Sequence, residues 1–170
     1  MDILDRLLGH DAWTTRQLLL RCRELSDAQL DQEFDIAHRS VRATLLHVIR
    51  NMEVWTDLIA GRPVRPDEGS DPAGRSVDGL LRRLNTVAGE LNEVATAIAR
   101  ENRLDELWVD YLDEPPTKKS YGGAIVHVVT HSMHHRAQLL YLLRRLGVRD
   151  LIEGDALSWE AQLKKVHRDP

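Results

Sequence analysis

The feature that most constrains the fold is a regular spacing of apolar residues in four long segments, each bounded by helix-starting or helix-ending residues. In each segment leucine and other apolar side chains recur every three or four positions, the period of an amphipathic helix. Ser40 and Ser76 are placed to cap two of the segments, and Gly61 and Gly147 are placed to end two of them. The pattern predicts helices over about residues 2–24, 41–60, 77–101 and 122–146.

The connections between these helices carry weaker signals. Residues 26–29 have the form of a capping box, so a short helical turn is expected there. Residues 61–75 hold three prolines and three glycines and are expected to form an exposed loop. Residues 103–121 are expected to form a crossover loop, although the alternation around Trp108 also fits a brief extended piece. A further short helix is expected near residues 158–163.

Length and charge narrow the class of protein. A chain of 170 residues, 42% of them hydrophobic, is long enough to bury its own core. We therefore expect a single domain over residues 1–170, with an all-α fold in the form of a four-helix bundle with long crossover connections. The net charge of −4 does not favour DNA or anionic membranes as partners, because binding to them requires concentrated positive charge. No uncharged stretch is long enough to span a membrane.

The amino terminus and the single cysteine favour a cytoplasmic location. Asp2 and Asp5 stand where a secretory signal would be apolar, and Cys22 has no second cysteine with which to form an internal disulfide. Both observations are typical of a protein from a reducing compartment. Cys22 lies between two arginines, which would favour a thiolate if it were exposed, but a plain helical cysteine is the favoured interpretation.

A cluster of histidines is the strongest chemical signal in the sequence. Four of the eight histidines lie at His127, His131, His134 and His135. Side chains four residues apart share one helix face, so His131 can converge on one ion with either His127 or His135. All three cannot, because His127 and His135 are about 12 Å apart along the helix axis. The helical phase of the apolar residues turns His131 and His135 toward the core and His127 and His134 away from it.

Two ligands rarely hold a first-row metal tightly, so a third is expected from a neighbouring helix. His47 is the candidate, since it lies in line with Val54 and Leu58 on a partly apolar stripe of the second long helix. Three neutral imidazoles with open positions would form a site of the catalytic type. Nitrogen ligands suit zinc, nickel, cobalt or iron, and the sequence does not select among these divalent ions.

At these residues the chain resembles the DinB-like family, and the resemblance spans almost the whole sequence. It is carried by Leu46-His47 with Glu53 and Trp55 downstream, by His127 to Gln138, by Leu146-Gly147-Val148, by Asp11 to Arg16 and by Leu151 to Asp155. The resemblance implies a four-helix bundle with a long crossover, a homodimer, and a divalent metal on three histidines, which here are His47, His131 and His135. The chain departs from the family at Ala137, often glycine, and at Thr14 or Thr15, often asparagine. These departures leave the three histidines in place.

Further side chains are candidates for a pocket or for contacts behind the ligands. His127 and His134 are expected beside the ligands or at the surface, and His10, His38 and His167 are expected to be solvated. Arg136 is expected to meet an anionic substrate group or a surface carboxylate. The remaining candidates are Trp55, Trp108 and Tyr111 as pocket walls or packing residues, and Glu53 or Asp57 as partners that orient His47.

The spacing of the histidines argues against one familiar chemistry. His131 and His135 have the spacing of a zinc-protease helix, but Ser132 stands where that helix carries its general-base glutamate. The resemblance implies a transferase that uses a low-molecular-weight thiol on a small electrophilic substrate, and a hydrolase is a related possibility. The alternative is a non-catalytic, metal-binding stress-response protein. DNA binding, suggested only by the family's association with DNA damage, conflicts with the acidic balance.

Overall fold

The four long helices predicted from the sequence are confirmed. The computed structural model describes residues 1–36 and 38–166, so the prediction for His167 lies outside the described residues. In each long helix a side-chain oxygen just before the first turn accepts a hydrogen bond from a free backbone amide of that turn. The bounds are α1, Ile3–Cys22; α3, Val41–Ile59; α5, Val77–Arg100; and α6, Tyr121–Arg145.

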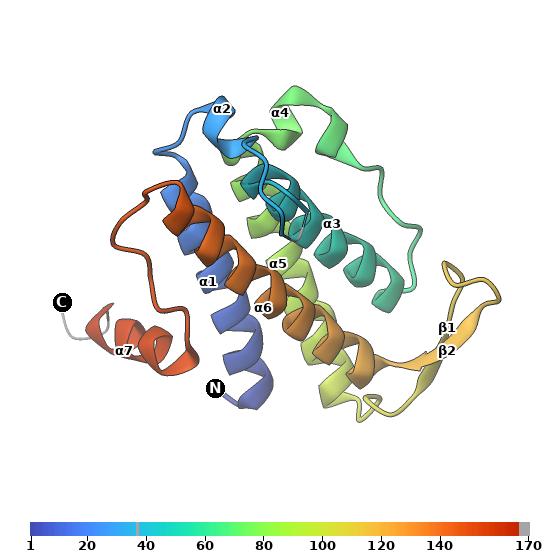
Figure 1. The fold of residues 1–170 in the computed structure, drawn as a ribbon. Helices are drawn as coiled ribbons and strands as arrows, with labels where there is room; N and C mark the ends of the chain where they lie inside the picture. Colours follow the sequence, from blue (N-terminus) through green and yellow to red (C-terminus); the bar gives the residue numbers. More distant parts are fainter. Residues whose placement is uncertain (37, 167–170) are drawn as a thin grey trace.

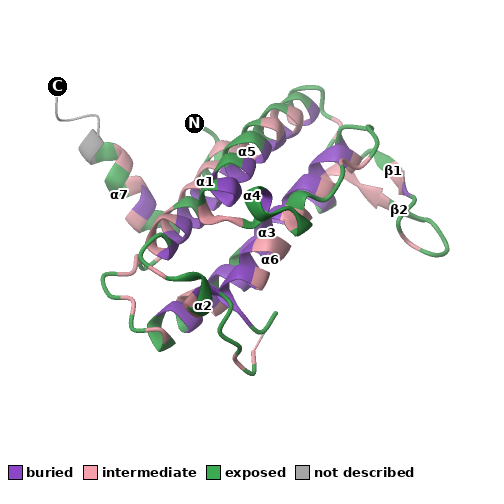
Figure 2. Cartoon of the chain, turned by 90° about the horizontal axis from the view of Figure 1, so that it is seen from above, coloured by how far each residue is buried: buried purple, intermediate pink, exposed green. Residues whose placement is uncertain are grey.

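These helices form an all-α bundle in which each helix packs against two others. The packed pairs are α1 with α5, α5 with α3, α3 with α6, and α6 with α1. As Figure 1 shows, α3 and α6 run in opposite directions, whereas α1 and α6 run the same way. The buried faces of the four helices point inward (Figure 2), and side chains such as Leu18, Ile49, Leu84 and Leu139 are almost completely shielded from solvent. Burial of this apolar surface is the main stabilising term.

The connection from α3 to α5 crosses the length of the bundle, as expected, but it is more ordered than a plain loop. It contains the 3-10 helix η1, Glu68–Ser70, and the short helix α4, Pro72–Arg75. Asp67 and Asp71 cap these turns with their carboxylates, and proline is favoured at a first helical position. The turn expected at residues 26–29 is also present, as α2, Asp27–Leu30, with its capping box.

The segment 103–121 is a β-hairpin at one end of the bundle and not a crossover loop. β1, Leu107–Asp110, pairs antiparallel with β2, Thr117–Ser120. Figure 1 shows the hairpin projecting beside the start of α6. The alternation around Trp108 was therefore the stronger signal, because it lets one face of β1 pack on the bundle while the other faces solvent.

The tail forms α7, Ala156–Val166, which packs against α1. Trp159 is buried against Gly9, where an added Cβ would come within 2.9 Å of the indole ring. His10 is also buried, and its Nε2 lies 2.8 Å from the carbonyl oxygen of Gly154. The expectation that His10 is solvated was wrong, because the tail folds back over α1. Among the described residues, no helix is both long and apolar enough to cross a membrane.

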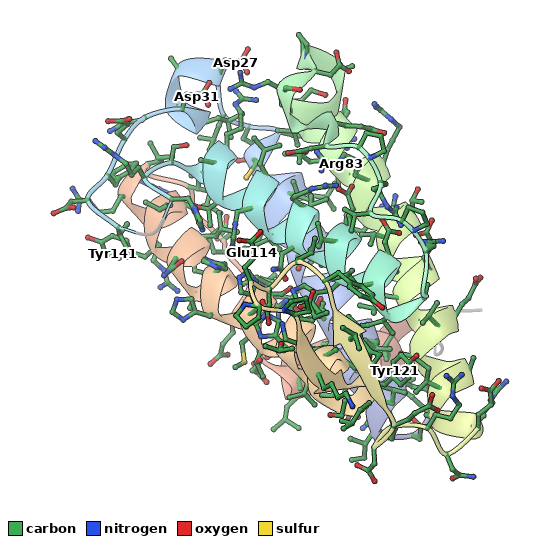
Figure 3. All side chains as sticks on the ribbon, turned by 90° about the vertical axis from the view of Figure 1, so that its right-hand side faces the viewer. Asp27, Asp31, Arg83, Glu114, Tyr121 and Tyr141 are labelled. Carbon is green, nitrogen blue, oxygen red and sulfur yellow. The ribbon has the colours of Figure 1, made fainter. Side chains whose placement is uncertain are left out.

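A buried ion pair joins α3 to α5. Arg83 projects from α5 (Figure 3), and its guanidinium donates two hydrogen bonds of 2.8 Å to the carboxylate oxygens of Glu53 on α3. Both residues are largely buried, at 7% and 4% exposure. Such a bidentate pair fixes the rotation of one helix against the other.

Removing Arg83 should destabilise the protein, because it leaves the Glu53 carboxylate buried with only Arg50 nearby, at 3.6 Å. We expect Arg83→Leu to lower the free energy of unfolding by about 3 kcal/mol, measured by urea denaturation. The matched control is Arg82→Leu, one residue away on the exposed side of α5, which should change it by less than about 0.5 kcal/mol. Equal effects of the two substitutions would show that the pair does not contribute.

Cys22 is buried at the end of α1, and burial raises the pKa of its thiol to about 12. The prediction that Cys22 is an ordinary helical cysteine, and not an exposed thiolate, therefore agrees with its burial. We expect iodoacetamide at pH 8 to leave the folded protein unmodified and to alkylate Cys22 fully in urea, as read by mass spectrometry, because only a thiolate reacts. Alkylation at equal rates in both states would contradict the burial of this side chain.

Candidate metal centre

Two imidazoles that are far apart in sequence meet where α3 packs against α6. Nε2 of His47 lies 3.0 Å from Nε2 of His131. His47 lies at the edge of the buried face of α3, and His131 lies at the edge of the buried face of α6. The packing of the two helices therefore sets the distance between these nitrogens.

His135 completes the group one helical turn beyond His131. Its ring centroid lies 4.7 Å from that of His47 and 4.5 Å from that of His131. Nδ1 of His135 donates to Oε1 of Gln138 at 2.7 Å. A neutral imidazole with its proton on Nδ1 has an unprotonated Nε2. Gln138 therefore selects the tautomer in which the lone pair of Nε2 is available to bind a metal ion. Gln138 lies within the family motif, but the sequence alone indicates no role for it.

A fourth imidazole, His38, also reaches this group. Its ring stacks on His47 with centroids 3.9 Å apart, and it lies 5.1 Å from the ring of His135. One ring nitrogen each from His38, His47 and His135 lies within 4.8 Å of the others, so these three form a cluster that could hold a metal ion. The expectation that His38 has no partners was wrong. His38 precedes α3 and has no helical phase, so periodicity gave no signal for it.

The structure thus assembles the predicted histidines together with one that was not predicted. His47, His131 and His135 remain a prediction as the ligand set, and His131 contacts the cluster through its close approach to His47. Nδ1 of His131 is buried and has no hydrogen-bond partner within the described part of the chain. Buried polar atoms usually have a partner, so this nitrogen is atypical.

The electrostatic environment keeps these imidazoles neutral. Burial, assisted by the neighbouring His38 and His135, lowers the pKa of His47 to about 4. Burial likewise lowers the pKa of His131 to about 4, assisted by His135 and His47. The pKa of His135 is also lowered by burial, although its hydrogen bond to Gln138 opposes the shift. At pH 7 His47 and His131 therefore offer lone pairs and carry no charge.

An aromatic wall lies beside the cluster, toward the hairpin. The ring of His127 lies 4.8 Å from that of Trp55 and 5.5 Å from that of His131. Trp55 also meets Trp108 of β1 edge to face at 6.2 Å, and the ammonium of Lys119 lies 4.9 Å from a Trp55 ring. Tyr111, the third proposed wall residue, is 75% exposed and stands apart from this group. Lys119 was not singled out from the sequence, because only the strand pairing brings it to Trp55.

Arg136 faces α1 and not the solvent. It is 3% exposed, and its guanidinium forms an ion pair with the equally buried Asp11 and a 3.3 Å hydrogen bond to Oγ1 of Thr15. Its carboxylate partner is therefore in the interior, and the expectation of a surface carboxylate was wrong. Arg136 therefore links α6 to α1.

The carboxylates that were considered as partners of His47 are engaged elsewhere. Glu53 accepts from Arg83, and Asp57 accepts from Arg62 and Arg65. These bonds turn both side chains toward α5 and the connection that follows α3. His134 is exposed, and its Nε2 lies 3.0 Å from the amide nitrogen of Gln138. His134 therefore contacts the residue that orients His135.

The donor set fits a divalent transition-metal ion. Tetrahedral bonds of about 2.0–2.1 Å to two imidazoles place their nitrogens about 3.3 Å apart. The distance between Nε2 of His47 and Nε2 of His131, 3.0 Å, is close to this value, and one ring nitrogen each from His38, His47 and His135 lies within 4.8 Å of the others. Neutral imidazoles need not lose a proton before binding, so the low pKa values favour occupation at pH 7.

The fold and this cluster define a helical bundle with a histidine-rich site that could hold a metal ion between two antiparallel helices. A model of the DinB family matches residues 1–158, nearly the whole chain. The chain therefore belongs to the DinB family. A search of curated proteins finds no match.

Gln138 should act as a positioning residue for His135. We expect Gln138→Leu to weaken Co²⁺ binding about 10- to 100-fold, measured by chelator competition, because the tautomer of His135 is no longer fixed. Thr130→Ala on the same helix is the control and should bind as the wild type does. Unchanged affinity in Gln138→Leu would show that the hydrogen bond does not prepare His135 for a metal.

Proposed function

We propose that the protein binds one divalent metal ion through His47, His131 and His135 and is a thiol-dependent transferase acting on a small electrophile. The observation that carries the proposal is the meeting of neutral imidazoles from two helices at the flank of the bundle. Ligands fixed on α3 and α6 are held by the packing of the whole core. Zinc, nickel, iron and cobalt all accept such nitrogens.

A divalent ion on neutral ligands keeps its full charge and lowers the pKa of a thiol that approaches it. In the proposed reaction the thiol gives its proton to solvent, and its sulfur forms a bond to the electrophilic carbon. The bond from that carbon to the leaving group breaks, and the electron pair departs with the leaving group. No redox partner is needed.

The chain's own residues would prepare this site in three ways. The imidazoles bind through nitrogens that are already unprotonated, and Gln138 orients His135. Trp55 and Trp108 shield the flank next to His131 from water and offer an apolar surface for the electrophile. Lys119, above Trp55, pairs with the carboxylates of Asp110 and Asp113, so it would hold the hairpin against this aromatic wall.

The alternative is a metal-binding protein without catalytic activity, as in a stress response. One observation favours it, namely that His38 lies beside the predicted ligands and offers a fourth imidazole. A tetrahedral ion that is fully surrounded by protein ligands has no position for a substrate. A homodimer and a cytoplasmic location remain predictions that rest on the family resemblance and on the sequence.

Metal binding is tested first. We expect the protein to take up one Co²⁺ or Zn²⁺ per chain, measured by elemental analysis after dialysis. His131→Ala should weaken binding at least about tenfold, since even residues behind the ligands contribute that much. Thr130→Ala, at an exposed residue on the same helix, is the matched control and should bind normally. Circular dichroism confirms that both variants fold.

Catalysis is tested separately on the metal-loaded protein. We expect it to consume an alkyl halide or epoxide together with one member of a panel of low-molecular-weight thiols, followed by loss of the free thiol. His131→Ala should abolish turnover and Thr130→Ala should not. Tight metal binding without turnover of any thiol would favour the non-catalytic alternative. Failure to bind any of the metals would overturn both the transferase proposal and the non-catalytic alternative.

A further inference from the structure

We propose that His38 is a fourth ligand of the metal, supplied by the loop before α3. The inference rests on the proposed metal site and adds a residue that the family resemblance does not place there. Its ring lies against His47, with centroids 3.9 Å apart and planes inclined by 28°. A ring nitrogen of His38 lies within 4.8 Å of those of His47 and His135.

The backbone around His38 is built to hold this position. Arg39, the next residue, has a φ of 70°, a left-handed conformation that residues other than glycine adopt at a cost. The amide of Ser40 donates to the carbonyl oxygen of His38 at 2.9 Å, and the amide of Phe34 donates to that of Arg39. Ser40 in turn caps α3 through its hydroxyl. The turn thus ties His38 to the start of the helix that carries His47.

Chemistry favours a ligand role over simple stacking. Unprotonated imidazole nitrogens have lone pairs, and a metal cation is the partner that several of them can share at this distance. Nε2 of His131 lies 3.0 Å from Nε2 of His47, so His131 brings a fourth imidazole to this group.

A fourth imidazole changes what the ion can do. Four nitrogens fill a tetrahedral sphere, so zinc would leave no position for a thiol unless His38 withdraws. An ion with six-coordinate geometry would keep two positions free. His38 is the ligand most able to withdraw, because it lies on a loop, whereas the other three are fixed on packed helices.

The test counts the imidazoles on Co²⁺ by X-ray absorption and follows the visible absorption of the ion. We expect four imidazoles in the wild type and three, with an added oxygen ligand, in His38→Ala. The affinity for Co²⁺, from chelator competition, should fall about tenfold or more. Thr130→Ala should match the wild type, and His131→Ala should also lose one imidazole. His38→Gln keeps a polar side chain in the loop and should behave as His38→Ala does.

The outcomes separate this inference from the proposed function. Three imidazoles in the wild type, with an unchanged spectrum in His38→Ala, would overturn the fourth ligand and leave the predicted trio standing. Loss of an imidazole in His38→Ala but not in His131→Ala would also overturn it, because His38 would then replace His131 in a site of three. A wild-type protein that binds no Co²⁺ would overturn the proposed metal site itself.

Discussion

The antiparallel packing of α3 against α6 is the constraint on which the rest of the structure depends. Apolar residues on both helices, among them Leu45, Ile49, Val128 and Leu139, are shielded from solvent and hold the two backbones at a fixed distance. The histidines occupy the flank of this interface, so burial of the core also fixes the spacing of the imidazole nitrogens. Stability and the candidate metal centre therefore share one interface.

Buried charges set how the other helices surround this pair. Arg83 and Glu53 join α5 to α3, and Arg136 and Asp11 join α6 to α1. Burying each pair costs free energy, and removing one partner costs more. Each pair therefore favours a single rotation of its two helices relative to each other. In α6 this places Arg136 toward α1 while His135, the preceding residue, faces α3. One helix thus presents a structural charge and a candidate ligand to different partners.

The site combines rigid and less rigid parts. His47, His131 and His135 lie on long helices, whereas His38 lies in a loop and Trp108 in a hairpin outside the bundle. Elements of this second kind open at lower free energy than a packed helix. Movement of these elements would therefore expose the flank of the bundle without disturbing the core. The choice between a catalytic and a closed metal site depends on the loop more than on the bundle.

The sequence alone determined the helices and the predicted metal-binding face, because helical periodicity and caps are local properties. It placed the four long helices and, from phase, turned His131 and His135 inward. Only the tertiary structure decided which groups meet. His38 and Lys119 lie outside any helix, Arg136 pairs with Asp11 from the other end of the chain, and residues 103–121 form a hairpin. Contacts between residues distant in sequence depend on how the faces pack, which no local pattern encodes.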